Sequence, residues 1–267
     1  MNFRMIRHII GWLLLFECVF LAVPALTAVV YRERVVVYYL GAMALCGLLG
    51  WLCIRRKPPV TALYAREGFV IVAMSWILLS LMGALPLWLS REIPSFVDAL
   101  FETVSGFTTT GASILPEVER LSHAALIWRS FTHWVGGMGV LVFIMAFVPL
   151  SGGRNMHIMK AESPGPSVSK LVPRVRTTAM ILYALYMALT VIEFIFLLCG
   201  RMSVFDALNT AFSTAGTGGF GVRNDGMAGY SNYLQTVVTV FMLLFSINFG
   251  CYYLLLLRRV REAFRMA

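Results

Sequence analysis

Threonine and glycine recur at the same spacing in two stretches of the chain, VDALFETVSGFTTTGAS at 97–113 and FDALNTAFSTAGTGGFG at 205–221. The stretches align without a gap, and each ends in the pattern Thr-x-Gly-x-small, beginning at Thr109 and at Thr217. Glycine adopts positive φ at little cost, so it lets successive backbone carbonyls turn toward one axis, and threonine can add a hydroxyl oxygen. Oxygen atoms arranged in this way can replace the water shell of an alkali cation.

The two loops match the pattern of a potassium-channel filter, Thr-Val-Gly-Tyr-Gly, in which backbone carbonyls coordinate the ion. A single Thr-x-Gly loop is also typical of a helix cap or turn, but two copies in register favour a pore. Neither loop carries a charged residue, which favours backbone recognition of a monovalent cation. The candidate ion ligands of the predicted selectivity filter are Thr109, Thr110, Gly111, Ala112, Thr217, Gly218, Gly219 and Phe220.

Asp98 and Asp206 occupy equivalent positions ahead of the two loops, where short helices of about a dozen residues are expected. A carboxylate at the start of a helix can cap free N–H groups and favours the positive end of the helix dipole. Both residues are therefore expected to support the filter. The alternative is that they concentrate cations at the mouth of the pore.

The composition places the chain in a bilayer, because 59% of the residues are hydrophobic and only 13% are charged. The short segments before the two loops cannot cross a membrane and suit re-entrant helices, so the predicted fold is an all-α polytopic membrane protein. Six apolar runs are long enough to span the hydrocarbon core: 9–30, 35–54, 69–89, 124–150, 179–199 and 234–257.

Lysine and arginine predict the orientation. With the N-terminus in the cytoplasm, fifteen of these residues lie in inner segments, six in outer segments, and only Arg129 lies within a span. The net charge of +9 therefore indicates topology rather than nucleic-acid binding, and both loops are expected to enter from outside. A cleaved signal peptide is the alternative for the first run, but its apolar core is too long.

The same patterns divide the chain into a helical hairpin, two pore repeats and connecting segments. Each repeat is expected to run span, re-entrant pore helix, filter and span. The expected organisation is a transmembrane hairpin at 1–57, a first repeat at 58–150, a cytoplasmic loop at 151–176, a second repeat at 177–257 and a basic cytoplasmic tail at 258–267.

A few polar or flexible residues lie within the predicted spans. Arg129 and His133 are four residues apart and share one helix face, and we expect a structural pairing rather than a role in the ion path. Glu17 and Glu193 are isolated carboxylates that we expect to bond neighbouring helices. The GGMG sequence at 136–139 should allow close helix packing behind a pore helix, with a gating hinge as the alternative.

Five segments of the chain carry a family resemblance: SGFTTTGAS (105–113), WRSFTHWVGGMGVLV (128–142), AESPGP (161–166), TGGFG (217–221) and INF (247–249). Together they resemble the membrane subunit of Trk-type bacterial potassium uptake systems, the TrkH branch of the Trk/Ktr/HKT superfamily. The resemblance implies a multi-pass protein of the bacterial inner membrane that transports K+ and needs no cofactor in this chain. It implies K+ contacts from Thr109, Thr110, Gly111, Thr217, Gly218 and Gly219.

Members of this family carry four repeats around one pore, whereas two are visible here, so the resemblance implies an N-terminal half. One alternative is a non-conducting half-subunit that needs a second chain to complete the pore. Another is a sodium-permeable relative, since plant HKT proteins with sodium preference have serine in place of the first filter glycine. Gly111 argues against the sodium alternative.

The resemblance also implies partners: a second copy of the chain or a missing C-terminal half, and a TrkA-like cytoplasmic ring that binds nucleotide. The loop at 151–176 would be the docking surface for the ring. The chain has no glycine-rich phosphate loop in a strand-to-helix context, so nucleotide is expected on the ring alone. A membrane enzyme built on Ser105, His133 and Glu193 lacks any motif spacing.

Overall fold

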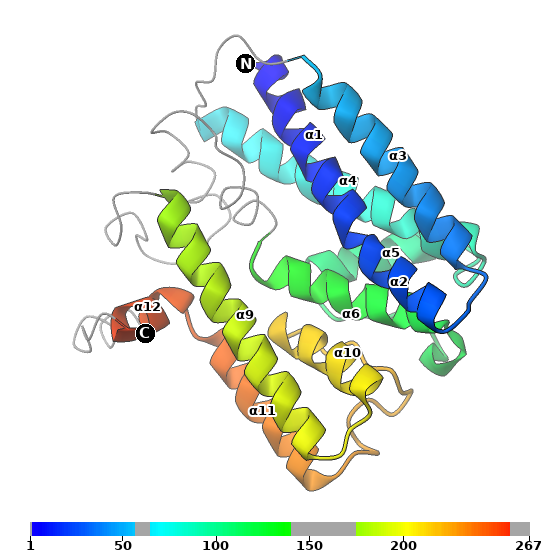
Figure 1. Ribbon diagram of the computed structural model, residues 1–267, viewed down its shortest axis with the longest axis vertical. Helices are drawn as coiled ribbons and strands as arrows, with labels where there is room; N and C mark the ends of the chain where they lie inside the picture. The colour runs from blue at the N-terminus through cyan, green and yellow to red at the C-terminus, as the bar shows by residue number, and fades with distance from the viewer. Residues whose placement is uncertain (1, 57–64, 140–174, 257–267) are drawn as a thin grey trace.

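The computed structural model describes residues 2–56, 65–139 and 175–256, and all regular structure within these ranges is helical (Figure 1). The all-α prediction is confirmed for this part of the chain. The helices are α1 Phe3–Phe20, α2 Ala22–Val30, α3 Val36–Ile54, α4 Ala65–Leu89, α5 Phe96–Phe107, the short 3-10 helix η1 Val118–Arg120, α6 His123–Gly137, α9 Val175–Cys199, α10 Val204–Ala215, α11 Asn232–Ser246 and α12 Phe249–Leu256.

Four helical stretches of the described chain are long and apolar enough to cross a membrane: Phe3–Val30, Val36–Ile54, Arg66–Leu89 and Ala179–Cys199. These four agree with the predicted runs. The predicted run at 124–150 is described only as far as residue 139, where α6 has already ended.

The predicted span at 234–257 is not one straight helix. The axis turns by 86° between α11 and α12, so the two helices form a span only as a bent pair. Ile247 has extended backbone, and the side-chain oxygen of Asn248 accepts a hydrogen bond of 2.8 Å from the Gly250 N–H. Asn248 thus satisfies a free donor at the start of α12, which lets the chain begin a new helix in a new direction.

The long helices at the N-terminal end pack closely. α1 lies along α3, and a Cβ atom on Gly50 would be 2.9 Å from the Gly11 carbonyl oxygen, so the two backbones approach at this pair of glycines (Figure 1). Glu17 of α1 is wholly buried, and neither carboxylate oxygen has a hydrogen-bond partner among the described residues. The expected bond from Glu17 to a neighbouring helix is therefore not found in the described part.

The order of a long, a 12-residue and a 15-residue helix occurs twice, as α4, α5 and α6 and then as α9, α10 and α11. The short helices α5 and α10 have the length predicted from the duplicated stretches. Figure 1 shows α6 beside both of them, and contacts join α6 to α5 and to α10. One helix of the first repeat therefore packs behind both short helices.

Serine side chains cap the two short helices. Ser95 accepts a hydrogen bond from the Asp98 N–H at 3.4 Å, and Ser203 accepts one from the Asp206 N–H at 3.0 Å. The prediction that the carboxylates are the caps is wrong, because the Ser-x-x-Asp sequence presents a hydroxyl at the N-cap position. Both carboxylates lie in the first helical turn, where they still favour the positive end of the dipole.

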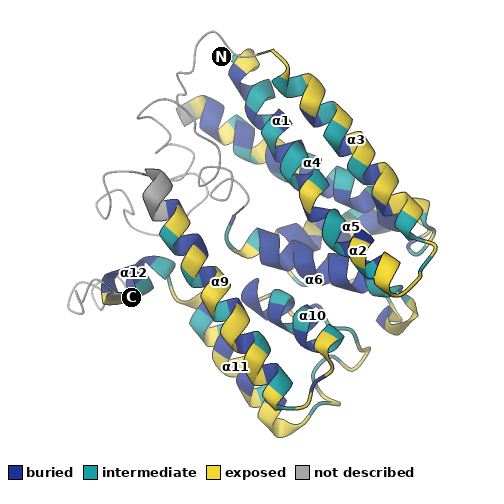
Figure 2. Ribbon diagram, in the orientation of Figure 1, coloured by how far each residue is buried: buried dark blue, intermediate teal, exposed yellow. Residues whose placement is uncertain are grey.

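Burial separates the helices into two groups (Figure 2). Every residue of α6 from Ala124 to Val135 is buried, although the helix contains an arginine and a histidine. In contrast, α3 and α9 present rows of exposed apolar side chains, as helices do when they face lipid. The polar residues of α6 are therefore enclosed by protein.

Candidate functional site

Each Thr-x-Gly loop begins as a helix cap. The N–H groups of Thr109 and Thr110 donate to carbonyls in the last turn of α5, at 3.0 and 2.9 Å. The N–H groups of Thr217 and Gly218 make the same two bonds in the last turn of α10, at 2.7 and 3.3 Å. This pair of bonds is the Schellman motif, which normally ends in glycine. The cap interpretation therefore holds for the first residues of both loops.

Four residues of the loops have left-handed backbone, at equivalent places. The φ angles are 56° at Thr109, 54° at Thr217, 74° at Gly111 and 88° at Gly219. Glycine adopts this conformation freely, whereas a β-branched residue with positive φ is an outlier that costs about 1–2 kcal/mol. Thr109 and Thr217 are the C′ residues of the two caps, a position that takes left-handed backbone in the Schellman motif, so the same strain occurs at equivalent places in both repeats.

The two loops touch through their backbones. A Cβ atom added at Gly111 would overlap the carbonyl oxygen of Gly218, whereas one added at Gly219 would meet no atom within 4 Å. Only glycine fits at Gly111, both because of its φ angle and because of this contact. The structure thus distinguishes two glycines that the sequence presents as equivalent.

The predicted ligands differ in exposure. In the first loop Thr110 and Ala112 are exposed, and Thr109 and Gly111 are partly covered; in the second loop Thr217 and Gly219 are exposed, and Gly218 is partly covered. The side chain of Phe220 is buried and packs into the protein, so only its backbone remains as a candidate ligand.

A cavity of about 220 Å³ lies between the loops and the segments that follow them. A water molecule occupies about 30 Å³ of liquid, so the cavity has room for several water molecules. Its walls are built from Gly111, Ser113, Leu115, Pro116, Val118, Arg129, Gly219, Phe220, Gly221, Arg223, Asn224 and Gly226.

Helix α6 packs tightly behind both loops. A Cβ atom at Gly136 would overlap the carbonyl oxygen of Phe107 at the end of α5, and one at Gly137 would lie 3.1 Å from the carbonyl oxygen of Ala215 at the end of α10. The predicted close packing is found, behind the ends of the short helices α5 and α10. His133 lies under the second loop, where its ring would meet a Cβ atom at Gly218.

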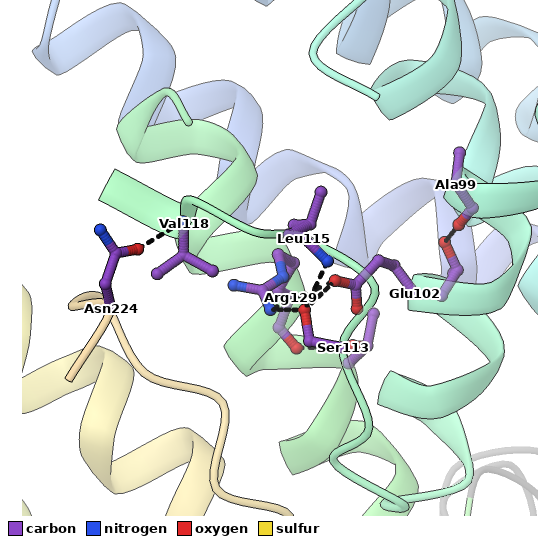
Figure 3. A network of polar contacts seen from close by, with 9 residues as sticks. Ala99, Glu102, Ser113, Leu115, Val118, Arg129 and Asn224 are labelled. Carbon is purple, nitrogen blue, oxygen red and sulfur yellow. Dashed lines mark hydrogen bonds and ion pairs between the residues drawn. The ribbon is translucent and has the colours of Figure 1, made fainter. Parts of the chain in front are cut away.

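A buried polar network joins α5, α6 and the first loop (Figure 3). Arg129 Nη2 lies 3.5 Å from Glu102 Oε1 and 3.3 Å from Ser113 Oγ, and Ser113 Oγ also donates to Glu102. The Arg129 guanidinium stacks 4.2 Å from the centre of the Phe220 ring in the second loop. A structural pairing is found for Arg129, with Glu102 as a partner that no sequence motif marked. For His133 it is not found, because neither ring nitrogen has a hydrogen-bond partner among the described residues.

The segments after the two loops are also joined to each other. The Val118 N–H donates to Asn224 Oδ1 at 2.8 Å (Figure 3). The Asn224 N–H donates to Glu119 Oε1 at 3.0 Å. Backbone and side-chain groups of one repeat thus satisfy those of the other. No periodic signal marks such a pair in the sequence.

Asp206 lies away from the filter residues of its own loop. It accepts a hydrogen bond of 3.1 Å from the Tyr230 hydroxyl, and burial together with this carboxylate raises the pKa of Tyr230 to about 12. Asp206 also lines a second cavity, of about 260 Å³, with Glu119, His123 and Arg223 among its neighbours. Its part in supporting the filter or attracting cations stays a prediction, as does that of Asp98.

Helices of membrane-crossing length and two equivalent backbone loops define an all-helical, multi-pass membrane protein. The chain matches the family model TrkH, a cation transport protein, over residues 32–266. It therefore belongs to the TrkH cation transport family, as the resemblance implied, and this is a family of transport proteins rather than enzymes.

Similar proteins of known name support the assignment. The chain is 37% identical over 265 residues to the Trk system potassium uptake protein TrkH of Salmonella typhimurium. This alignment covers 96% of this chain and 54% of the relative. It is 34% identical over 260 residues to the Trk system potassium uptake protein TrkG of Escherichia coli, covering 96% of this chain and 54% of that protein. The chain spans about half the length of the curated relatives it matches.

The fold is similar to a solved transporter. The crystal structure of the potassium transporter TrkH from Vibrio parahaemolyticus aligns with a TM-score of 0.80 at 31% sequence identity. The alignment covers 95% of this chain and 52% of that one. The helices described above thus correspond to about half of a known potassium transporter.

Proposed function

We propose that this chain supplies two walls of a potassium-selective pore and takes part in K+ uptake across the bacterial cell membrane. The observation that carries the proposal is the matched backbone of the two loops, which have positive φ at Thr109 and Thr217 and again at Gly111 and Gly219. Contact between Gly111 and Gly218 brings the two loops to one place. Carbonyls held in this way can replace the hydration shell of K+.

The short helices favour a cation at the loops. Both α5 and α10 end where a loop begins, so the negative ends of their dipoles lie next to the proposed filter. Neither loop carries a charged residue, which leaves backbone carbonyls and threonine hydroxyls as ligands. In this proposal α5 and α10 are pore helices, each part of a repeat of span, pore helix, filter and span.

The proposed orientation follows from lysine and arginine. The N-terminus, the loop at 151–176 and the tail at 258–267 are cytoplasmic, and both filter loops enter from outside, because fifteen basic residues then lie inside and six outside. The segments 151–176 and 258–267 lie mostly outside the described residues. A TrkA-like nucleotide-binding ring docked on the cytoplasmic side is part of the same proposal.

A second proposal concerns the number of filter walls that one copy of the chain supplies. The filter of a potassium channel surrounds its ion from four sides, whereas two Thr-x-Gly loops give two walls. Loop carbonyls on the open side would face lipid, and each unsatisfied group there costs several kcal/mol. The chain spans about half the length of its curated relatives, and with two filter walls we propose that it conducts only together with a second copy or with further repeats.

Flux measurements test both proposals. The purified chain is reconstituted in liposomes without any other subunit, and rubidium and sodium uptake are compared with those of the complete assembly, meaning the chain together with the further repeats that close the ring. We expect rubidium-selective uptake by the complete assembly and none by the unassociated chain. A complete assembly that admits sodium as readily as rubidium would contradict the potassium pore and favour the sodium-permeable alternative. Selective uptake by the chain alone would instead favour a symmetric dimer.

A further inference from the structure

Arg129 touches groups from three separate parts of the molecule. It lies on α6, it pairs with Glu102 of α5, and its guanidinium contacts Ser113 of the first loop and the Phe220 ring of the second loop. The side chains of Arg129 and Glu102 are buried, with 3% and 0% of their surfaces exposed. Figure 3 shows Arg129 directed toward Ser113 and Glu102.

The second repeat lacks an equivalent of this pair in its described residues. Both α6 and α11 begin after a capping serine, Ser122 and Ser231, and the residue seven positions further is Arg129 in one case and Val238 in the other. Glu102 of α5 corresponds to Thr210 of α10. In the described residues, the buried arginine that contacts the second loop, through the Phe220 ring, thus comes from α6 of the first repeat.

Stability alone does not explain a buried ion pair at this place. Desolvation of two charges often cancels their attraction, and apolar residues of similar volume can do as well or better. An arginine differs from an apolar residue in geometry, because its planar fork can donate in fixed directions and stack on a ring at the same time. In the structure Nη2 alone donates, to Glu102 and Ser113, while the guanidinium lies over the Phe220 ring; Nε and Nη1 have no hydrogen-bond partner among the described residues.

We propose that Arg129 is a positioning residue that holds the two Thr-x-Gly loops in one fixed relation, with Glu102 orienting its guanidinium. The proposal rests on the assignment of these loops as filter walls. Ion selectivity then depends on a contact between repeats as well as on each loop by itself. Arg129 need not touch the ion to affect the choice between K+ and Na+.

Arg129→Lys tests this role, because lysine keeps the positive charge beside Glu102 but loses the fork and the planar stacking surface. In the complete assembly we expect Arg129→Lys to accumulate like the unchanged protein, while its ratio of rubidium to sodium uptake falls about tenfold, within the range of coupling between residues of one network. The neutral pair Glu102→Gln with Arg129→Met, which leaves no unpaired buried charge, should lose selectivity similarly. Arg120→Gln is the control, because Arg120 is an exposed arginine paired with Glu117. An unchanged ratio in Arg129→Lys or in the neutral pair would overturn the proposal.

A double-mutant cycle tests the contact between repeats without ion flow. Arg129→Lys and Phe220→Leu are made singly and together, and the apparent melting temperature of the purified chain is measured in detergent. We expect the double variant to lower the melting temperature by less than the sum of the two single variants, because either substitution breaks the same contact. Arg129→Lys combined with Phe3→Leu, at an exposed position of α1, should be additive.

The two experiments separate two kinds of failure. Additive effects of Arg129→Lys and Phe220→Leu would overturn the proposed bridge, whatever the fluxes show. The other failure is a non-additive cycle in a protein whose unsubstituted form does not discriminate rubidium from sodium. That result would reject the filter assignment and leave the contact between Arg129 and Phe220 as a structural one.

Discussion

Thr109 and Thr217 hold a backbone conformation that β-branched residues rarely adopt, and each stands two positions before a glycine with positive φ. The sequence predicted that both loops would turn their carbonyls, because it repeats threonine and glycine at one spacing. It could not separate Gly111 from Gly219, since only Gly111 has a carbonyl oxygen of the other loop against its Cα. Nor could it show that Phe220 packs inward, because burial of that ring depends on Arg129 and His133 of α6.

The two glycines should respond differently to the same substitution. Gly219→Ser places a side chain in open space, so we expect the free energy of unfolding to fall by about 1–2 kcal/mol, mainly because of the left-handed backbone. Gly111→Ser adds an overlap with the Gly218 carbonyl, so we expect a further loss of about 1–3 kcal/mol and a greater loss of selectivity. Apparent melting temperature and the ratio of rubidium to sodium uptake measure both effects. Equal losses in the two variants would show that the loops are not in contact as described.

Helix lengths and helix types were predictable, whereas helix ends were less so. The 12-residue α5 and α10 follow from the duplicated stretches, and the exposed faces of α3 and α9 follow from continuous apolar runs. The bend between α11 and α12 was missed because the run on both sides of Asn248 is together apolar enough for one span, so its mean hydropathy does not mark the break. The polar bridge through Glu102 was missed because it joins elements that no sequence period relates.

The cap of α5 gives a prediction at the level of one helix. Ser95→Ala removes the side-chain acceptor of the Asp98 N–H, so we expect a loss of about 1 kcal/mol in the free energy of unfolding. Asp98→Asn keeps the cap and removes only the interaction of the carboxylate with the helix dipole, about 0.3–1 kcal/mol. Denaturation of the purified chain in detergent, followed by circular dichroism, compares the two. A larger loss in Asp98→Asn would identify the carboxylate as the dominant group.

Across the whole molecule, the two repeats share one interior rather than standing as separate units. α6 of the first repeat packs behind the end of α10, and the segments after the loops exchange hydrogen bonds through Val118 and Asn224. Composition was sufficient to predict a membrane protein, and the repeated order of helices was visible in the sequence. The packing of α6 against both short helices was not visible in the sequence, because a duplication by itself suggests two copies that each pack alone.

Chemical labelling tests the orientation of the molecule. In a background without the five native cysteines, Arg56→Cys after α3 should resist a membrane-impermeant thiol reagent in intact cells, because the excess of basic residues places that end inside. Ala228→Cys, at an exposed position after the second loop, should react. Permeabilised cells serve as the control, since both cysteines should react there. The reverse pattern in intact cells would contradict the proposed topology.

The hydrogen bond between Val118 and Asn224 joins residues that are 106 positions apart. During synthesis at about 5–20 residues per second, Asn224 leaves the ribosome about 5 to 20 seconds after Val118. The first loop is therefore synthesised before the partner groups of Gly218, Phe220 and Asn224 exist. Its contacts are completed late, and the nascent first repeat has to persist through this interval with polar groups, such as the Val118 N–H, that the second repeat satisfies in the described structure.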